Sequence, residues 1–334
     1  MRFGLALPQY GFSLSGGEVG FETTAWWARR AEELGFDSVW LSDHFFYTFT
    51  RYGGDPTPIP AIEPLTSLAA LATMTSRVRL GTLVLCAPFR HPALLAKMAL
   101  TIDRLSGGRL DLGLGAGWLE EEFDAFGFPF GSIGDRFTAL EDALAALSAL
   151  QSGETADLDG LTVTLRDASM LPPPVNGRIP VWVGGKGGPR LLRSIATHAD
   201  GWNVVWRVDP ETYAPRVAAA RAAFAVAGRD PSALRLSVGL YASVAEDEAA
   251  ARAAFERGRA RFPGGAMDAD TWQTWRADTL SGTPEQAVER IRRFEELGVE
   301  EIVISASVLP FAVDDPEMVD VLAERVMAPL RSAS

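Results

Sequence analysis

The chain has 334 residues, carries a formal net charge of −12 at pH 7 and is 47% hydrophobic. This length and hydrophobic content predict one large domain or two small ones around a sizeable core, and exclude a disordered chain. The acidic balance excludes a general affinity for nucleic acid, which requires a basic surface. An anionic ligand would have to be captured by local donors, because the protein as a whole repels it.

The chain has a single cysteine, Cys86, which excludes an internal disulfide framework and favours a reducing compartment. The apolar run at the N-terminus is short and is broken by Pro8, unlike a signal peptide. No run of about 18 apolar residues is present that would span a membrane. We therefore expect a cytoplasmic protein that acts on a small molecule, with neither a nucleic-acid nor a membrane partner.

Short apolar strands alternate with amphipathic helical stretches along the chain. In the helix predicted over 135–150, for example, Leu140, Leu144 and Leu147 follow the helical period. The predicted strands are 3–7, 38–41, 78–85, 110–114, 179–183, 201–205, 234–240 and 301–304. The predicted helices are 21–34, 63–75, 92–105, 135–150, 189–198, 210–227, 246–262, 283–297 and 316–330.

Eight strands, each followed by a helix, predict a single α/β domain over residues 1–334 that closes as a (β/α)8 TIM barrel. Two segments are interpreted as insertions: 154–176 after the fourth strand, with a small hairpin, and an irregular 263–280 after the seventh. An open doubly wound sheet is the alternative fold. Active sites of barrels lie at the C-terminal ends of the strands, so these ends are where we look for chemistry.

The fourth strand has an unusual composition. In the segment RLDLGLGAGW, residues 109–118, leucines alternate with glycines. Alternate residues of a strand share a face, so one face is apolar and the other is almost bare. A bare face allows a large flat ligand to lie against the backbone. The alternative is that small residues only interleave with large ones in a packed interior.

Histidine is scarce, with only His44, His91 and His198 in the chain. This is too few for the metal site of a barrel hydrolase, so we expect no metal. His44 follows the second strand, and its neighbour Asp43 is placed to bias its tautomer. Histidine is readily tuned for proton transfer near neutral pH, although a loop histidine that only hydrogen-bonds locally is the alternative. His91 and His198 lie at helix ends and are expected to cap or pack.

A glycine-rich loop, GGKGG at 184–188, ends the fifth strand, and a helix begins at Pro189. Backbone N–H groups before a helix N-terminus, together with the helix dipole, favour an anion. Lys186, Arg190 and Arg193 add positive charge there. Phosphate sites recur in the later βα loops of barrels, so the loop predicts a phosphate cradle, and a turn without a ligand is the alternative.

A bare strand face, a phosphate cradle and one histidine together fit a flavin-like cofactor better than a sugar or an aldol substrate. Lys186 is rejected as a Schiff-base lysine, because in a glycine loop its amine is solvated and charged.

The chain resembles the luciferase-like family of barrel oxidoreductases, and within it the branch that depends on the deazaflavin coenzyme F420. The resemblance covers nearly the whole length. It rests on the motifs MRFGLALPQ, GFDSVWLSDHF, RVRLGTLVLCAPFRHPALLAK, LSGGRLDLGLGAGWLEEEFDAFG, RIPVWVGGKG and ADGW, in that order.

The resemblance implies hydride transfer between C5 of the deazaflavin and a small organic substrate. It places Asp43 and His44 at the reactive edge of the ring, with His44 as proton donor or acceptor. It implies a bulge at Leu83-Val84, often with a non-proline cis peptide, that supports the ring from behind. The remaining cofactor contacts that it implies are Ala116, Gly117 and Trp118 at the ring, and Gly184, Gly185, Lys186 and Gly187 at the phosphate. Members of the family are commonly homodimers.

The chain departs from the sugar-phosphate dehydrogenases of this family, which have an acid in place of Trp118 and a tryptophan in place of Thr48. These differences argue against a glucose-6-phosphate dehydrogenase, and Trp118 favours a hydrophobic or aromatic substrate. Trp272 and Trp275 either cover the mouth of the barrel or pack against its exterior.

Three alternatives remain open for the activity. The first is a two-component monooxygenase that uses reduced FMN and oxygen. The others are a non-catalytic flavin-binding relative and a non-redox barrel lyase.

Overall fold

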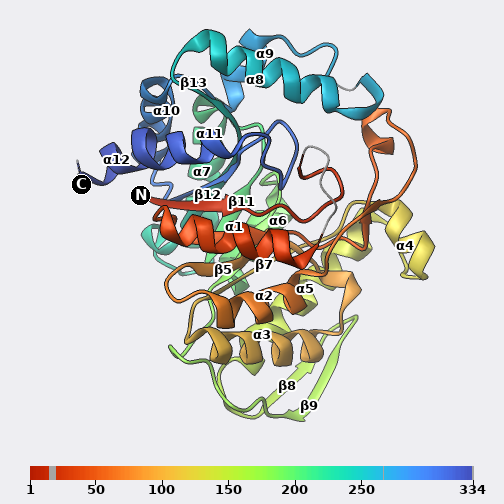
Figure 1. The fold of residues 1–334 in the computed structure, drawn as a ribbon. Helices are drawn as coiled ribbons and strands as arrows, with labels where there is room; N and C mark the ends of the chain where they lie inside the picture. Colours follow the sequence, from red (N-terminus) through yellow and green to blue (C-terminus); the bar gives the residue numbers. More distant parts are fainter. Residues whose placement is uncertain (15–19, 266, 333–334) are drawn as a thin grey trace.

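A closed ring of parallel strands forms the centre of the protein and helices surround it (Figure 1). The computed structural model describes residues 1–14, 20–265 and 267–332. Within these residues the strand order is β10-β11-β12-β14-β1-β2-β5-β7, and β7 pairs with β10, which closes the ring. The predicted (β/α)8 barrel is therefore confirmed, and the open sheet is wrong.

The elements follow the predicted alternation of strand and helix. The barrel strands are β1 (Arg2–Ala6), β2 (Ser38–Leu41), β5 (Arg79–Thr82), β7 (Leu110–Gly115), β10 (Val181–Gly184), β11 (Gly201–Val204), β12 (Arg235–Val244) and β14 (Glu301–Ser305). The surrounding helices are α1 (Phe21–Glu33), α2 (Pro64–Met74), α3 (Pro92–Ser106), α5 (Ile133–Leu150), α6 (Pro189–His198), α7 (Pro210–Val226), α8 (Glu248–Arg261), α10 (Pro284–Glu296), α11 (Pro316–Val321) and α12 (Ala328–Ser332). None of the helices in the described ranges combines the length and the apolar character needed to cross a bilayer.

The third predicted strand, 78–85, differs from the prediction because it is interrupted. It consists of β5 and a short β6 (Leu85–Cys86), and the peptide bond between Leu83 and Val84 that separates them is cis. The resemblance implied a bulge at this position. A second non-proline cis peptide, Val205-Trp206, follows β11 and had no counterpart in the sequence analysis.

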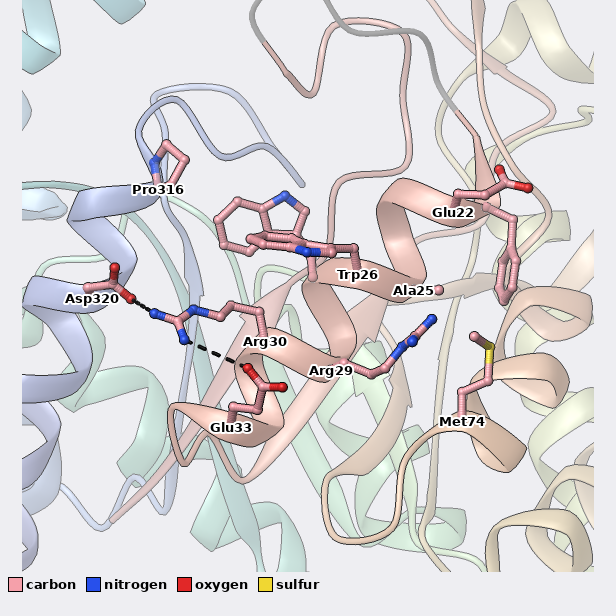
Figure 2. Close-up of a pocket in the computed structure, with 11 residues that line it drawn as sticks. Glu22, Ala25, Trp26, Arg29, Arg30, Glu33, Met74, Pro316 and Asp320 are labelled. Carbon is pink, nitrogen blue, oxygen red and sulfur yellow. Dashed lines mark hydrogen bonds and ion pairs between the residues drawn. The ribbon is translucent and has the colours of Figure 1, made fainter.

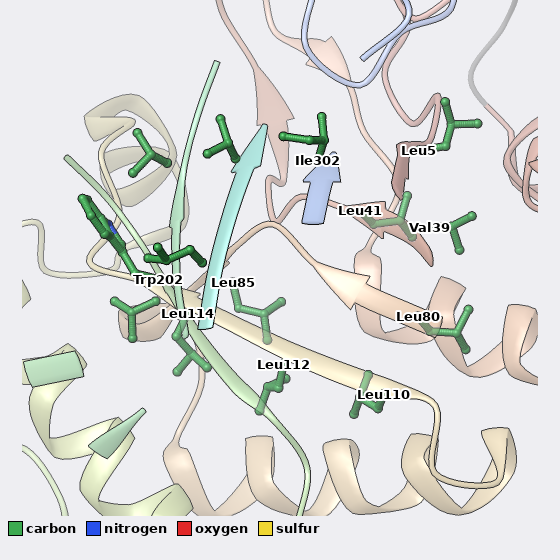
Figure 3. Packing of buried hydrophobic residues seen from close by; sticks show 14 of the residues in the cluster. Leu5, Val39, Leu41, Leu80, Leu85, Leu110, Leu112, Leu114, Trp202 and Ile302 are labelled. Atoms are coloured by element: carbon green, nitrogen blue, oxygen red, sulfur yellow. The ribbon is translucent and has the colours of Figure 1, made fainter. Parts of the chain in front are cut away.

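The outward faces of the strands form the main core. Leu110, Leu112 and Leu114 of β7 are fully buried and pack with Leu80, Val39 and other strand residues under the helices (Figure 3). The predicted division of this strand into a leucine face and a glycine face is therefore confirmed. Because leucine occupies every second position, the whole apolar face meets the helices.

The inside of the barrel is filled by two tryptophans. The rings of Trp40 and Trp182 meet edge to face, with their centroids 6.5 Å apart. Glycines on neighbouring strands make room for them: a Cβ on Gly81 would lie 2.2 Å from the Trp40 ring, and one on Gly201 would lie 2.3 Å from the Trp182 ring. Large and small side chains therefore alternate around the interior.

A layer of ion pairs lies next to these rings, at the N-terminal ends of the strands. Arg2 contacts Glu301 at 3.0 Å, and Arg79 contacts Asp111 at 2.5 Å. Both carboxylates are fully buried, so they need these partners. The indole N–H of Trp182 also donates to Asp111, at 3.1 Å. The barrel is thus packed at this end, and a ligand would have to enter from the C-terminal end.

Several excursions gather at the C-terminal end of the strands. After β2 come β3 (Phe46–Tyr47), the 3-10 turn η1 (Thr50–Tyr52) and β4 (Ile59–Pro60), and after β7 comes the short helix α4 (Glu120–Phe126). The segment after α8 begins with the 3-10 turn η4 (Pro263–Gly265), which meets η1. We call the C-terminal opening of the barrel, together with these excursions, the mouth.

The two predicted insertions match the prediction to different degrees. The first contains the small hairpin that was expected there, formed by the antiparallel strands β8 (Ala156–Asp159) and β9 (Thr164–Ala168). The second was expected to be irregular, which is wrong, because it contains the helix α9 (Trp272–Asp278) and the strand β13 (Leu280–Gly282). A capping box formed by Thr271 and Thr274 starts this helix.

The packing of glycine against Trp40 yields a first prediction. Gly81→Ala should destabilise the protein by about 1–3 kcal/mol, because the new methyl group would overlap the Trp40 ring. The free energy of unfolding in urea measures this. Gly134→Ala is the matched control: in α5 an added Cβ meets its nearest neighbour at 3.4 Å, and alanine stabilises a helix by up to about 1 kcal/mol. Equal effects of the two substitutions would contradict the account of the barrel interior.

Candidate active site at the mouth of the barrel

His44 is held by a buried carboxylate from α4. Its Nδ1 lies 2.7 Å from Oε2 of Glu122, whose side chain is 1% exposed, whereas that of His44 is 11% exposed. The other oxygen of Glu122 accepts the backbone N–H of Phe45 at 2.5 Å. Because Glu122 accepts hydrogen bonds from the backbone, it accepts from Nδ1–H of His44 as well, and this leaves Nε2 as the nitrogen that can exchange a proton.

Glu122 was not predicted as a partner of His44. Asp43, the chain neighbour of His44, was expected to bias the imidazole, and the structure corrects this, because the hydrogen-bond partner lies 78 residues further along the chain. Three glutamates, Glu120 to Glu122, begin α4, and of these only Glu122 is buried. A run of glutamates at a helix start is ordinary, and only the burial of Glu122, which the sequence does not reveal, sets it apart from its neighbours.

Asp43 belongs to a separate ion pair. Its two oxygens accept from the guanidinium of Arg90 at 2.5 and 2.9 Å, and one of them also accepts the backbone N–H of Cys86 at 2.9 Å. Arg90 reaches Glu63 as well, at 2.7 Å. Burial opposes the charge of Arg90, but the hydrogen bonds and charges of the two carboxylates prevail and raise the pKa of the guanidinium. Asp43 therefore ties the loop after β2 to the segment after β6, and its part in catalysis stays a prediction.

The bare glycine face of β7 is covered by the chain itself. A Cβ on Gly115 or on Gly184 would lie 2.8 or 2.9 Å from the side chain of Val84, and one on Gly113 would lie 2.1 Å from the carbonyl oxygen of Thr82. The glycines thus make room for the bulge, and the expectation of a flat ligand directly on this backbone is corrected. Val84 is only half-buried, so it presents an accessible apolar surface with glycine behind it.

The glycine-rich loop runs from the end of β10 to Pro189, the first residue of α6. Gly187 has a φ of +80°, and a Cβ there would lie 2.6 Å from the Trp202 ring. Nothing lies within 4 Å of the position that a Cβ on Gly188 would occupy. Gly188 precedes α6 and offers no side-chain cap, so the N–H groups of the first turn remain available to an anion.

The two positive side chains Arg190 and Lys186 near this loop differ in whether they already have a carboxylate partner. Arg190 was expected to serve the loop, but its guanidinium pairs with Glu141 of α5 at 2.6 Å and also donates to the carbonyl of Gly134 at 3.0 Å. Lys186 is exposed, and no ion pair of Lys186 occurs within the described ranges. Lys186 is thus the lysine of the loop that is available to a phosphate.

Trp118 lies beside His44, with the ring centroids 5.7 Å apart. Tyr47 approaches the same indole edge to face at 6.0 Å, and the guanidinium of Arg51 lies 5.1 Å from its centroid. The two residues before Trp118 follow β7 closely: Ala116 is half-buried, and a Cβ on Gly117 would lie 2.7 Å from the sulfur of Cys86. His44 and Trp118, predicted separately, therefore meet at the mouth.

Trp272 and Trp275 are both buried but have different neighbours. Trp272 packs against Phe255 of α8 and donates its indole N–H to Glu248, whereas Trp275 reaches the wall of the mouth. Trp275 stacks on Tyr241 at 5.4 Å, and Tyr241 stacks on Trp206 at 5.5 Å. Trp206 is half-buried, and the preceding Val205 is 41% exposed. The wall formed by Trp206 and Tyr241 was not predicted, because no spacing along the chain indicates a stack between different strands.

A groove of about 790 Å³ lies elsewhere, on the outside of the barrel beside α1 (Figure 2). Trp26 borders it, and Arg30 pairs there with Asp320 at 2.6 Å. None of its lining residues comes from the C-terminal end of a barrel strand. We therefore place the candidate active site at the mouth and not in this groove.

Comparison with known proteins identifies the family of the chain. A profile of luciferase-like monooxygenases matches residues 1–301, so the chain belongs to the luciferase-like monooxygenase family. A phthiodiolone/phenolphthiodiolone dimycocerosates ketoreductase of Mycobacterium bovis is 35% identical over 61% of this chain and 56% of the ketoreductase. An F420-dependent glucose-6-phosphate dehydrogenase of Microbacterium testaceum is 30% identical over 63% of this chain and 60% of the dehydrogenase. The matches thus span somewhat more than half of these relatives.

Among solved structures, a monooxygenase of Streptomyces bottropensis superimposes with a TM-score of 0.77. It is 25% identical, and the alignment covers 99% of this chain and 100% of the monooxygenase. The similar proteins thus include both an F420-dependent dehydrogenase and a monooxygenase.

The buried pair of Asp43 and Arg90 yields a second prediction. Arg90→Met should destabilise the protein by about 3–5 kcal/mol, because it leaves the carboxylate of Asp43 buried without its cation. Unfolding in urea at neutral pH measures this loss. The control is Arg325→Met, which removes an exposed pair with Glu246 and should cost about 0–1 kcal/mol. A loss below about 1 kcal/mol at Arg90 would show that Asp43 does not depend on the pair.

Proposed function

We propose that this protein is an F420-dependent oxidoreductase that transfers a hydride between C5 of the deazaflavin and a small hydrophobic substrate. The observation that carries the proposal is the grouping of three features at the mouth. These are the glycine-rich loop before α6, the accessible apolar surface of Val84, and His44 fixed by Glu122. The F420-dependent relative supports the choice of cofactor.

The residues of the mouth fit such a cofactor. The uncapped first turn of α6 and the exposed Lys186 would hold the phosphate. The half-buried Val84 and the exposed Val205 would support the flat ring. When bound, the deazaflavin supplies the site that gives or takes the hydride.

His44 handles the proton that accompanies the hydride. With Nδ1–H donated to Glu122, Nε2 accepts a proton from a substrate hydroxyl during oxidation, or returns one to a carbonyl oxygen during reduction. Glu122 stabilises the imidazolium that forms and holds the ring in one orientation. Trp118 and Tyr47 pack beside the imidazole and exclude water from it.

Hydrophobic substrates suit this mouth better than sugar phosphates. The resemblance puts an acid at the position of Trp118 and a tryptophan at that of Thr48 in the sugar-phosphate dehydrogenases. Here Trp118 faces the imidazole with an indole, and the hydroxyl of Thr48 bonds that of Thr50 at 2.9 Å. The activity of the glucose-6-phosphate dehydrogenase relative is therefore not transferred to this chain.

A two-component monooxygenase that uses reduced FMN is the second candidate. The Streptomyces monooxygenase supports it, because the likeness extends over nearly the whole of both chains. FMN also has a flat tricyclic ring and a phosphate, so the same residues would hold it.

Titration of the purified protein with F420 and with FMN, followed by absorbance and fluorescence, tests the choice of cofactor. F420 should bind at least about tenfold more tightly than FMN, a difference of about 1.4 kcal/mol.

Gly188→Asp tests the phosphate site. It should weaken F420 binding about tenfold or more relative to the wild type, because a carboxylate at the start of α6 repels the phosphate. The same substitution should leave the melting temperature unchanged or higher, because aspartate caps a helix better than glycine and the position has open space. Gly188→Ala is the control that adds a Cβ without the charge. Tighter binding of FMN than of F420 would reject the first candidate in favour of the second.

The pair of His44 and Glu122 yields a further prediction. His44→Gln should lower kcat by about 10²- to 10⁴-fold, as expected for the loss of a general acid–base group. Glu122→Gln should lower kcat by about 10- to 100-fold, because it loosens the group that orients the imidazole. Turnover is followed as the change in F420 absorbance with the best substrate of a panel of apolar alcohols and ketones.

In both variants the Kd for F420 should stay within about twofold of the wild type, because neither residue is placed at the phosphate loop. Glu121→Gln is the matched control on the same helix, since Glu121 accepts the Thr50 hydroxyl and not the imidazole. An unchanged kcat in His44→Gln, with binding retained, would favour a flavin-binding protein without catalytic activity.

A further inference from the structure

Arg51 differs from every other arginine that lies over an aromatic ring in the described part of the chain. The others also donate hydrogen bonds to carboxylate, hydroxyl or carbonyl oxygens, whereas no hydrogen bond or ion pair of the Arg51 guanidinium occurs among the described residues. The arginines that have such acceptors are Arg136, Arg190, Arg207, Arg229, Arg235, Arg259, Arg276 and Arg331.

This guanidinium lies at the mouth. Arg51 belongs to η1, in the excursion after β2, and is exposed. It lies over Trp118, 5.1 Å from the ring centroid, and the same indole is 5.7 Å from the His44 ring. One aromatic ring therefore separates an arginine that has no acceptor among the described residues from the residue proposed to move the proton.

Two carboxylates close to Arg51 in this excursion and on α4 have other partners. Glu121 accepts the hydroxyl of Thr50, and Asp55 accepts the backbone N–H of Thr57 at 2.7 Å. The chain as a whole has 43 acidic and 31 basic residues. In so acidic a protein, an arginine beside the candidate site that pairs with none of the carboxylates in the described ranges is available to an anionic group of a ligand.

We propose that Arg51 binds a carboxylate group of the substrate while the apolar body of the substrate packs against Trp118. This inference deepens the proposed function and rests on it, because it assigns the substrate class: hydrophobic or aromatic acids that carry an alcohol or carbonyl group. A planar guanidinium matches a carboxylate with two parallel hydrogen bonds. The cation–π contact with the Trp118 indole would hold the guanidinium of Arg51 in position for them.

The experiment compares acids with their uncharged amides. Wild-type protein is titrated by calorimetry with 3-phenylpropanoate and 3-phenylpropanamide and with octanoate and octanamide, each with and without F420. The acids should bind at least about tenfold more tightly than the amides, as expected for hydrogen bonds to a charged group. The preference should fall as the salt concentration rises, because salt screens the acid but not the amide.

Arg51→Met should reduce the preference for acids over amides to about twofold or less. Arg51→Lys should keep part of this preference, because lysine retains the positive charge but not the two parallel N–H donors of the guanidinium. The matched control is Arg276→Met: Arg276 also lies over an indole, that of Trp272, but is paired with Glu248. It should retain the preference of the wild type. Arg51 is exposed, so the two Arg51 variants should keep the melting temperature of the wild type. A cooperative thermal transition of Arg276→Met would show that the control is folded as well.

Equal binding of acids and amides to the wild type, or an undiminished preference in Arg51→Met, would overturn the inference. A loss of F420 affinity in Arg51→Met with the preference for acids unchanged would also overturn it, because Arg51 would then serve the cofactor. If F420 does not bind at all but the preference for acids is present and depends on Arg51, the proposed function fails and the anion site stands.

Discussion

The architecture of this protein depends on glycines that receive large side chains from neighbouring strands. Gly81 and Gly201 admit the indoles of Trp40 and Trp182, which fill the barrel. Gly115 and Gly184 admit Val84 from the bulge between β5 and β6. A methyl group at any of these glycines would overlap its partner. The filled interior leaves the C-terminal end for a ligand, and the bulge gives that end its accessible apolar surface.

Two buried carboxylates at the mouth illustrate how the partner decides the role of an acid. Asp43 is matched by the guanidinium of Arg90 and accepts a backbone N–H, so its charge is used to join two loops. Glu122 is matched by an imidazole ring, whose second nitrogen is left without this partner. The first acid is held in an ion pair that joins two loops, whereas the second is bonded to an imidazole, a group suited to proton transfer. This difference is the basis for proposing His44 as the proton-transferring residue.

The sequence predicted local elements well and contacts across the barrel poorly. Long helices such as α5 present several turns of periodic leucines, and these were recognised. The helices α4 and α9 have only seven residues each, too few for a period, and both were missed. The mouth shows the same limit. His44 and Trp118 were singled out separately, but the link from His44 to Glu122 joins residues 78 positions apart.

The sequence by itself determined the alternation of strand and helix, the glycine loop before α6 and the two faces of β7, because these depend on periodicity and on residues close together in the chain. The motifs also carried the resemblance to the family. Only the tertiary structure decided that Val84 covers the glycine face, that Arg90 forms the ion pair with Asp43, and that Glu122 hydrogen-bonds His44. Barrel closure brings distant loops to one end, and which of their side chains then meet depends on packing in three dimensions, which has no period along the chain.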